Sequence, residues 1–485
     1  MVMCLPTFNF RFSDKRILPW AAGGAALLVY LATLAPSLTW AHWGADGGDF
    51  IAAAATERLP HPPGFPLYLT LARVFVLLPL RDPAWRLNLL SAAMVAGTVT
   101  LTALTLQRQE KSPWIVLAAA LALAFAPLLW SQALITEVYT TAAFFAAWAN
   151  DELRVMSCEL RVTNRRWVLA GMVCGLGMAV HPTLMFLVPL WLVDLFIDDD
   201  RQSKRMSHLT HYVSRFTFYV SRFTFYVFGI LIGLLPYALL PLLGRWPQPW
   251  GDLRTFAGWW DVVTARLYRG YAFGLPWAEW PARVAAWAAL LARQFTPVGG
   301  ALIVLGGWLG WRERRWEVLG LAAAGGLLSL FAIGYATPDS LVYMLPLLPL
   351  AVPLLARGLR WLVDKGLPAW ATLLLPLILL VGNWQTVTLH RDDEAVMWYN
   401  QVLAATPADA VLITTQGDRY TFALWYAQEA LGLRPDVLVI DRNLWWQESY
   451  RQYVFARSGV KVAAPEDYAA GRPLCRIMGE GVACP

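Results

Sequence analysis

The stretch GADGGDFIAAAATERLPHPPGFPLY, residues 44–68, directly follows the first long hydrophobic run of the chain. It combines Asp46 and Asp49 with His61 and a series of prolines. Ionisable side chains are costly in hydrocarbon, so this stretch is expected to lie just outside a bilayer. The fold class then depends on whether the rest of the chain is built to cross a membrane.

The composition favours an α-helical polytopic membrane protein. Of 485 residues, 58% are hydrophobic and 15% are charged, whereas a soluble protein has about a quarter charged residues. The 26 tryptophans fit aromatic belts at two membrane interfaces. The net charge of +6 suits anionic lipid at the cytoplasmic surface, and we do not interpret it as nucleic-acid binding.

About eleven apolar runs are candidate transmembrane helices. The first follows RFSDKR and lacks an A-x-A-like cleavage site, so we expect a retained signal anchor. Segment 66–80 is shorter than the roughly 20 residues that a spanning helix needs, and we expect a juxtamembrane helix there. The candidate spans are residues 18–36, 87–106, 113–130, 132–149, 167–182, 183–197, 224–243, 296–311, 316–335, 340–356 and 367–384.

The loop charges set the predicted orientation. If 66–80 does not span, every loop assigned to the cytoplasm contains Lys or Arg, including QRQEK, NDELRVMSCELRVTNRR, RERR and ARGLRWLVDKG. The outer side then holds loops 37–86 and 244–295 and the tail 385–485. We therefore predict an integral protein of a bacterial inner (plasma) membrane, with a cytoplasmic N-terminus and an extracytoplasmic tail.

The tail differs in character from the apolar part. DAVLITT, DRYTFALWYAQEALG and RPDVLVIDRNL predict a strand, a helix and a strand, hence one βαβ unit with a right-handed crossover. We expect a transmembrane domain at 1–384 and a small α/β domain at 385–485. Cys475 and Cys484 could pair if the tail lies outside the cytoplasm.

Ionisable residues gather near the predicted outer face. Asp46 and Asp49 lie in the first outer loop, Glu137 falls in the first turns of span 132–149, and His181 lies at the outer end of span 167–182. An ionisable side chain at a membrane helix is a functional-site hypothesis by default. The sequence therefore predicts a site at the outer interface.

Structural roles remain open for these residues. Asp46 or Asp49 could be the N-cap of FIAAAATERL, because Asp is favoured there. Glu137 could cap a helix or form a local salt bridge. His181 precedes a proline and could simply end a helix.

The same holds for His61 and for three arginines. HPPGFP could be a stiff turn, because proline fixes φ. Arg254, Arg266 and Arg269 of the second outer loop could keep their stems in lipid and their charges in water.

Several motifs resemble a known family. DGGDF, HPPGFPLYLTLARVF, RLNLLSA, SQALITEVYT, PWGDLRTF, TARLY, GDRYTFALWYAQ and RPDVLVI occur, from about residue 25 to about residue 455, in the order seen in the family of the protein O-mannosyltransferase known as transmembrane protein 260. More distantly, an acidic first loop followed by HPP resembles the GT-C glycosyltransferase class. The resemblance implies a GT-C-like fold. It also implies transfer of a sugar, such as mannose, from a polyprenyl-phosphate donor to a protein or glycan hydroxyl.

The family motifs map onto individual positions. Asp46 matches the leading acidic position, and Asp49 stands where the family more often has Glu. His61 opens the HPPG element, and Glu137 and Tyr139 match the acidic start of a later helix.

Further matches are expected to bind substrate. Trp250 and Asp252 belong to the WGD element, and Tyr268 lies in TARLY. His181 matches the family histidine only loosely.

The implied chemistry assigns provisional roles. Asp46 is expected to be the general base that deprotonates the acceptor hydroxyl, with Asp49 or Glu137 orienting the acceptor or raising the pKa of Asp46. The sequence alone does not separate Asp46 from Asp49. Inversion at the anomeric carbon follows by analogy with the class.

The leaving phosphate requires positive charge or hydrogen-bond donors. Arg254 and Arg266 are expected to bind it, since guanidinium groups match phosphate oxygens. His61 could donate a hydrogen bond to the phosphate or to the sugar.

No cofactor is required by this residue set. A divalent ion between Asp46 and Glu137 stays an alternative, whereas zinc spacing and a P-loop are absent from the sequence. Two other functions are alternatives. A transporter or flippase of lipid-linked sugars would place its ionisable residues at the bilayer midplane, often with internal repeats, and a non-catalytic scaffold would not need the acidic residues.

Overall fold

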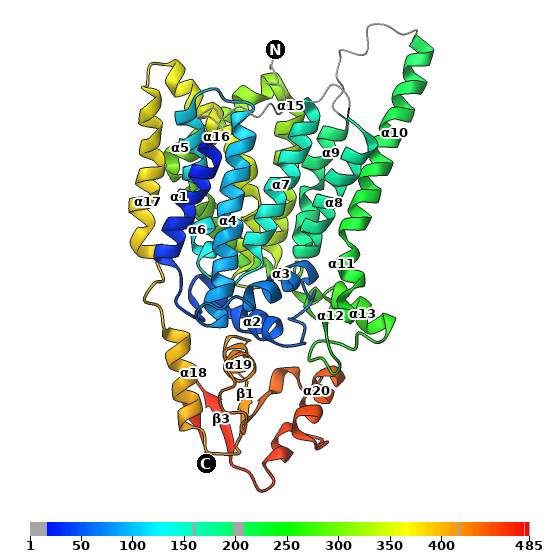
Figure 1. Ribbon diagram of the computed structural model, residues 1–485, viewed down its shortest axis with the longest axis vertical. Coiled ribbons are helices and arrows are strands. Elements are labelled where there is room, and N and C mark those ends of the chain that lie inside the picture. Colours follow the sequence, from blue (N-terminus) through cyan, green and yellow to red (C-terminus); the bar gives the residue numbers. More distant parts are fainter. Residues whose placement is uncertain (1–16, 159–161, 197–207, 416–417, 480, 485) are drawn as a thin grey trace.

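The computed structural model describes residues 17–158, 162–196, 208–415, 418–479 and 481–484. A bundle of helices forms one end of the molecule and a smaller α/β unit the other, with short helices between them (Figure 1). The N-terminal end of the bundle lies far from the α/β unit.

The first half of the bundle is built from helices of very different length. They are α1 (Leu18–Thr33), the 3-10 helix η2 (Ala41–Asp46), α2 (Gly47–Ala55), α3 (Pro66–Val76), α4 (Pro83–Gln107), α5 (Pro113–Ala124), α6 (Pro127–Ala133), α7 (Tyr139–Cys158), α8 (Asn164–Val180), the 3-10 helix η3 (Pro182–Leu187), α9 (Val188–Phe196) and α10 (His208–Gly233).

The second half contains several short helices and the longest one. They are α11 (Leu235–Ala238), α12 (Leu240–Leu243), α13 (Phe256–Val263), the 3-10 helices η5 (Arg266–Tyr271) and η6 (Trp277–Glu279), α14 (Trp280–Gln294), α15 (Thr296–Gly334), the 3-10 helix η7 (Ser340–Met344), α16 (Leu347–Asp364), the 3-10 helix η8 (Ala369–Leu373) and α17 (Leu374–Val387).

The helices support a membrane protein, but the predicted count of about eleven spans is not confirmed. In the described ranges, four helical segments are long and apolar enough to cross a bilayer, namely 83–107, 219–243, 296–334 and 369–387. Helices α5 and α6 would form a fifth if their 62° bend belongs to one span. The expected juxtamembrane helix at 66–80 is the short apolar helix α3.

Two predicted spans differ from the structure for identifiable reasons, and one predicted break is present. Span 113–130 is broken because Pro127 starts a new helix, and proline disfavours helical geometry in the residue before it. Span 132–149 instead begins at Tyr139, so Glu137 lies in the connection before α7 and not in its first turns. The break expected at RERR is present as a kink, because Arg314 has non-helical angles and two helices meet there within α15.

Glycines let α8 and α10 pack closely. A Cβ atom on Gly171 would lie 2.0 Å from the carbonyl oxygen of Tyr226, and one on Gly229 would lie 2.1 Å from that of Val168. Gly175 and Gly233 follow one turn later and make similarly close contacts. Small residues four apart are the usual means by which membrane helices approach each other without a solvent-driven force.

The C-terminal unit (residues 394–484) is a small sheet with helices around it. Its elements are α18 (Glu394–Ala405), β1 (Val411–Thr414), α19 (Asp418–Trp425), the π-helix η9 (Tyr426–Ala430), β2 (Leu438–Asp441), the 3-10 helix η10 (Arg442–Leu444), α20 (Glu448–Ser458), the 3-10 helix η11 (Pro465–Ala469), β3 (Leu474–Met478) and β4 (Gly481–Ala483). The strand order is β2-β1-β3-β4.

The strand–helix–strand unit predicted for the tail is present. Strand β1 pairs parallel with β2, with Val411 opposite Leu438, and parallel with β3 on its other side, with Val411 opposite Leu474. Strand β4 returns antiparallel to β3. A disulfide joins Cys475 to Cys484 and closes this edge of the sheet.

The C-terminal unit lies directly on the first loop. Helix α19 is adjacent to α2, as Figure 1 shows. A Cβ atom on Gly48 of α2 would lie only 2.3 Å from the carbonyl oxygen of Phe422 in α19. The side chains of the first loop are therefore covered by residues from near the other end of the chain.

Candidate active site

Asp49 holds His61 through two contacts with the same carboxylate oxygen. Its Oδ2 accepts a hydrogen bond from the backbone N–H of His61 at 2.7 Å and lies 3.0 Å from the ring Nδ1. Asp49 is completely buried in the first turn of α2. Since an ionised carboxylate only accepts hydrogen bonds, the geometry assigns the proton on this side of the ring to Nδ1.

Asp46 faces the opposite side of the same ring. Its Oδ2 lies 3.6 Å from Nε2 of His61, and about a third of its side chain is accessible, at 31%. Asp46 is the N-cap residue of α2, but its side chain makes no capping hydrogen bond. His61 therefore stands between a buried carboxylate and an accessible one.

The HPPG element is a tight turn that aims the His61 ring. The backbone N–H of Gly64 donates to the carbonyl oxygen of His61 at 2.9 Å, and Gly64 has a φ of +82°, which glycine adopts without strain. Helix α3 starts immediately afterwards at Pro66. The expected stiff turn and the expected functional role of His61 are thus compatible.

Aromatic rings enclose His61 on several sides. Their centroids lie 5.1 to 6.2 Å from that of His61, and one ring from the C-terminal unit is stacked on it with an interplanar angle of 9°. Two of these rings come from the predicted WGD and TARLY motifs, so the structure brings these elements together around His61. The rings belong to Phe50, Phe65, Trp250, Tyr268 and Phe422.

Arg58 connects this cluster to the C-terminal unit. Its Nη2 lies 3.0 Å from Oδ1 of Asp49, and its Nε lies 3.1 Å from Oε2 of Glu429. The guanidinium also lies over the ring of Trp425, 4.3 Å from its centroid. Burial alone would lower the pKa of Arg58, but the two carboxylates raise it above its ordinary value, so the side chain stays charged.

Glu429 is shared by a second cation. Nη1 of Arg457 lies 2.6 Å from its other carboxylate oxygen, and the hydroxyl of Tyr453 donates to the same oxygen. Buried charges are tolerated when each is paired and hydrogen-bonded. Each charge from Asp49 to Arg457 has an ion-pair partner, whereas the guanidinium of Arg58 is held by ion pairs and by the ring of Trp425 without a hydrogen bond.

Glu137 adds another buried carboxyl group to the site. Its side chain is 2% exposed. Burial raises its pKa well above the ordinary value, and the nearby carboxylates Asp46 and Asp339 raise it further. Glu137, Asp46 and Asp339 are therefore close enough to interact electrostatically.

Asn88 of α4 fixes the backbone around Glu137. Its amide oxygen accepts a hydrogen bond from the hydroxyl of Thr136 at 2.8 Å, and its amide nitrogen donates to the carbonyl oxygen of Ala35 at 3.2 Å. This arrangement ties the segment before Glu137 to the end of the first hydrophobic run. Asn88 belongs to the RLNLLSA motif.

His181 lies in a second aromatic cluster next to the first. Its ring centroid lies 5.3 Å from that of Tyr139, 5.5 Å from Tyr343 and 5.7 Å from Phe65. Burial, followed by the neighbouring His61, lowers the pKa of His181 to about 3, so it is neutral at physiological pH. His181 also ends α8 and caps η3 by accepting from the N–H of Thr183.

The structure places the expected phosphate-binding arginines in surface ion pairs. Arg254 makes a two-pronged contact with Asp252, at 2.9 Å for each pair of atoms. Arg266 pairs with Asp261 at 2.9 Å. Both guanidinium groups are therefore held by carboxylates of their own loop at the surface.

Arg283 is a further basic residue near the acidic cluster. Its Nη2 donates to the carbonyl oxygen of Tyr335 and to the hydroxyl of Ser340, each at 3.0 Å. It lines a cleft of about 450 Å³ together with Leu275, Glu279, Ala282, Ala286 and the segment 336–338. Segment 336–338 of this cleft directly precedes Asp339 in the chain.

Sequence reasoning missed Arg58, Asp339, Phe422 and Glu429. Asp339 could have been found, because like Glu137 it is a carboxylate at the outer end of an apolar run. Phe422 and Glu429 carry no local signal, since only the docking of the tail brings them to the first loop. No three His, Cys, Asp or Glu side chains of the described ranges are grouped as metal ligands.

Two protein-family models match the segments of the chain that form this site. Residues 46–204 match the model of the Protein O-mannosyl-transferase TMEM260 N-terminal domain. Residues 396–463 match TMEM260-associated domain 2. The chain resembles the TMEM260 family. The first match begins at Asp46 and includes Asp49, His61, Glu137 and His181, and the second includes Phe422 and Glu429.

Individual relatives extend this likeness along the chain. The mouse Protein O-mannosyl-transferase TMEM260 is 25% identical over 482 residues, covering 89% of this chain and 65% of the mouse protein. The Dictyostelium discoideum protein of the same name is 27% identical over 253 residues, covering 48% of this chain and 28% of that protein. The chain thus spans just under two thirds of the mouse TMEM260 and a smaller part of the other.

The fold is shared with a solved membrane protein. ArnT from Cupriavidus metallidurans, solved with undecaprenyl phosphate bound, superposes with a TM-score of 0.62 at 13% sequence identity. The likeness covers 96% of this chain and 93% of ArnT. This likeness shows that the mostly helical chain has a GT-C-like fold.

Proposed function

We propose that this chain is an inverting GT-C-type glycosyltransferase that moves a sugar from a polyprenyl-phosphate donor to an acceptor hydroxyl. The observation that carries the proposal is the grouping of Asp46, Asp49 and His61 with Glu137 beneath the C-terminal unit. The TMEM260 relatives are named protein O-mannosyl-transferases, which favours mannose as the sugar and a protein hydroxyl as the acceptor.

Asp46 is the general base in this proposal. It is the accessible member of the pair that flanks His61, whereas Asp49 is fully occupied by Arg58 and by His61. Asp46 removes the acceptor proton as the hydroxyl oxygen bonds to the anomeric carbon. The bond from that carbon to the phosphate oxygen breaks, and polyprenyl phosphate leaves with the electron pair. Asp49 acts through His61 as a positioning residue.

Three arginines are candidates to bind the donor phosphate. Arg283 lines the cleft beside Asp339, and its described hydrogen bonds are with uncharged oxygens, while Glu279 lines the same cleft without a described ion pair to it. Arg254 and Arg266 would have to leave Asp252 and Asp261, which exposed ion pairs do at little cost. ArnT, which shares the fold, was solved with undecaprenyl phosphate, and this supports a lipid-phosphate donor.

The remaining predicted residues would bind the sugar or the acceptor. Trp250 and Tyr268 flank His61, and Tyr139 lies against His181. A neutral His181 donates from one ring nitrogen and accepts at the other. It can therefore hold a sugar hydroxyl without attracting the phosphate away from the arginines.

The reaction would take place outside the cytoplasm. The Cys475–Cys484 disulfide supports this side for the C-terminal unit, because disulfides persist in oxidising compartments. The loops rich in Lys and Arg then face the cytoplasm. A bacterial inner membrane remains our prediction, since the TMEM260 relatives named above are from a mouse and an amoeba.

A transporter or flippase of lipid-linked sugars is less favoured. Such proteins place their ionisable groups near the bilayer midplane. Here the acidic residues lie in the first loop, in a helix connection and under the C-terminal unit. A second function therefore has no specific observation in its favour.

The donor class is tested with purified protein in nanodiscs. Radiolabelled polyprenyl-phosphate mannose and glucose are offered with serine- and threonine-containing peptides, in parallel with nucleotide sugars. The proposal predicts transfer only from lipid-phosphate donors, with the opposite anomeric configuration in the product. Transfer from nucleotide sugars, or retention of configuration, would refute it.

A further inference from the structure

Asp339 is an acidic residue beside the candidate active site that has no role in the proposed mechanism. It lies in the segment 335–339 between α15 and η7 and is half-buried. Its side chain does not cap η7, and among the described residues its carboxylate takes part in no hydrogen bond or ion pair. Asp339 and the proposed base Asp46 both act electrostatically on Glu137. Asp339 is therefore a carboxylate of the same site that can accept hydrogen bonds from a ligand.

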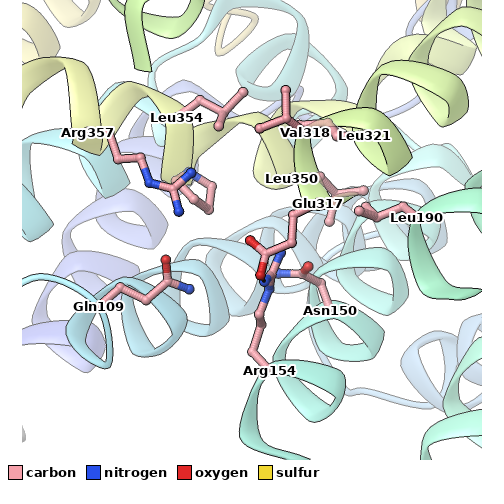
Figure 2. Close-up of a pocket in the computed structure, with 11 residues that line it drawn as sticks. Gln109, Asn150, Arg154, Leu190, Glu317, Val318, Leu321, Leu350, Leu354 and Arg357 are labelled. Atoms are coloured by element: carbon pink, nitrogen blue, oxygen red, sulfur yellow. Dashed lines mark ion pairs between the residues drawn. The ribbon is translucent and has the colours of Figure 1, made fainter. Parts of the chain in front are cut away.

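Glu317 of α15 provides a contrast, because arginine side chains of the protein hold it. Figure 2 shows its carboxylate pointing toward Arg154 of α7, with which it forms an ion pair. The same carboxylate lies 2.9 Å from Arg314. Buried carboxylates are usually paired in this way. Asp339 is not held by a cation, although Arg283 donates to the backbone of the residue before it.

Arg283 of α14 holds the backbone of this segment rather than the carboxylate of Asp339. Its guanidinium donates to the carbonyl oxygens of Tyr335 at 3.0 Å and of Pro338 at 3.3 Å. It also donates to the hydroxyl of Ser340 at 3.0 Å. These hydrogen bonds fix the position of Asp339 before a ligand binds, and a specific binding site requires such support.

A closed circuit of aromatic rings links the segment of Asp339 to the HPPG element. Each ring contacts the next, with centroids 5.2 to 6.1 Å apart. In order around the circuit, the rings belong to His61, Tyr268, Tyr271, Tyr335, Tyr343, His181 and Phe65. Aromatic side chains with a small number of polar groups are the usual lining of a small-molecule site.

Two carboxylates act on one tyrosine of this circuit. Tyr335 directly follows α15. Burial raises the pKa of its hydroxyl to about 12, and the carboxylates of Asp339 and Asp46 contribute to the rise. Asp339 and Asp46 therefore both lie within electrostatic reach of Tyr335, although they are far apart in the chain.

A buried donor next to the circuit has no protein partner. The Trp250 side chain is 5% exposed, and its ring centroid lies 6.1 Å from that of His61. In the described ranges its indole Nε1 makes no hydrogen bond. A buried polar group without a protein partner is uncommon, and beside a candidate active site it points to a ligand.

We propose that Asp339 binds the transferred sugar and determines which sugar is accepted, while Asp46 acts on the acceptor hydroxyl. This inference rests on the proposed function. An ionised carboxylate only accepts hydrogen bonds, and its two oxygens together take those of neighbouring sugar hydroxyls. The aromatic circuit packs against the apolar parts of the sugar ring, so the carboxylate fixes its orientation.

The test compares kcat/KM for donors that differ by one hydroxyl group. Full-length protein in nanodiscs is given polyprenyl-phosphate mannose and, in turn, donors whose mannose lacks one hydroxyl. In the wild type at least one deoxy donor should lose about 10- to 100-fold in kcat/KM, the scale of a hydrogen bond to a charged group. In Asp339→Ala the same donor should perform within about twofold of mannose, because the partner of the missing hydroxyl is already gone.

Each result is a ratio of two donors measured on one preparation, so partial unfolding of a variant does not change it. Glu57→Ala is the matched control, because it removes an exposed carboxylate of the first loop, and it should keep the wild-type ratio. Asp339→Asn keeps one acceptor oxygen without the charge and should give an intermediate ratio. It also supplies the ratio if Asp339→Ala retains too little activity to measure.

Two results would overturn the inference alone. The first is wild-type transfer that is insensitive to the loss of any sugar hydroxyl. The second is a wild-type ratio for every deoxy donor in Asp339→Ala and Asp339→Asn, even if both variants are slow, since Asp339 would then act on something other than the sugar. In contrast, no transfer by the wild type from any lipid-phosphate sugar would overturn the proposed function, and this inference with it.

Discussion

Arg58 of the first loop and Glu429 of the C-terminal unit form a buried ion pair, with Nε and Oε2 3.1 Å apart. The same guanidinium holds Asp49, which in turn holds His61. The end of the chain is therefore physically continuous with the candidate catalytic loop. In our proposal the C-terminal unit completes the active site as well as covering it.

Arg58→Ala should destabilise the protein strongly. It leaves Asp49 and Glu429 buried, with Asp49 lacking its cation, and breaking a buried pair from one side costs about 3–5 kcal/mol. Arg245→Ala is the control, because Arg245 and Glu57 form an exposed pair worth about 0–1 kcal/mol. Thermal unfolding of both variants in the same detergent measures the difference. Equal, small shifts would show that the buried pair contributes little.

Gly48→Ala should separate the C-terminal unit from the first loop. The added methyl would lie 2.3 Å from the carbonyl oxygen of Phe422, a backbone atom that cannot move away alone. Overpacking of this kind costs about 1–3 kcal/mol. Limited proteolysis should cut the tail sooner in this variant. Gly24→Ala, which meets nothing within 4 Å, should be cut like the wild type, and equal rates in all three would contradict the packing.

Asp49→Asn should lower kcat while changing KM little. An amide in place of the carboxylate turns one of the contacts with His61 or Arg58 into a donor facing a donor, so the ring loses its fixed orientation. Misplacing a reacting group by about 1 Å can cost about 10²-fold in rate. Asp49→Glu keeps the charge and should recover part of kcat. A rise in KM alone would assign Asp49 to substrate binding.

The sequence was sufficient to predict those parts of the site whose residues are close together in the chain or are marked by their composition. Asp46, Asp49 and His61 lie in one polar stretch beside an apolar run, and their clustering follows from that position. The strands β1 and β2 follow from two short β-branched runs separated by a helical segment. These signals are local.

The remaining features depend on long-range packing. Glu429 and Phe422 meet the first loop only because the tail folds back onto α2. The start of α7 only at Tyr139 depends on how neighbouring helices pack, since the hydropathy pattern permits other boundaries. Likewise, the spacing of residues in the sequence does not predict that Arg254 pairs with Asp252 and Arg266 with Asp261 at the surface.

Glu137 should make stability depend on pH above its ordinary pKa of 4.5. Burial and the carboxylates Asp46 and Asp339 raise the pKa in the folded state, so the folded protein keeps this proton to higher pH than the unfolded chain. Its contribution is complete below about pH 4.5 and is lost as pH rises through the raised value.

Glu137→Gln stays neutral and should flatten this decline. Melting temperatures from about pH 5 to about pH 9 measure the slope. Glu57→Gln, which changes an exposed carboxylate of the first loop, should keep the wild-type slope. Identical slopes in wild type and Glu137→Gln would show that Glu137 does not hold a proton in this range.

The most direct test of the proposed mechanism is the rate of sugar transfer from polyprenyl-phosphate mannose by Asp46→Asn relative to the wild type and to Glu57→Gln. The account predicts that Asp46→Asn lowers kcat by about 10²-fold or more, the scale of general-base catalysis, while Glu57→Gln retains wild-type kcat. Donor binding by Asp46→Asn should be unchanged. Transfer at the wild-type rate in Asp46→Asn would contradict the assignment of Asp46 as the base.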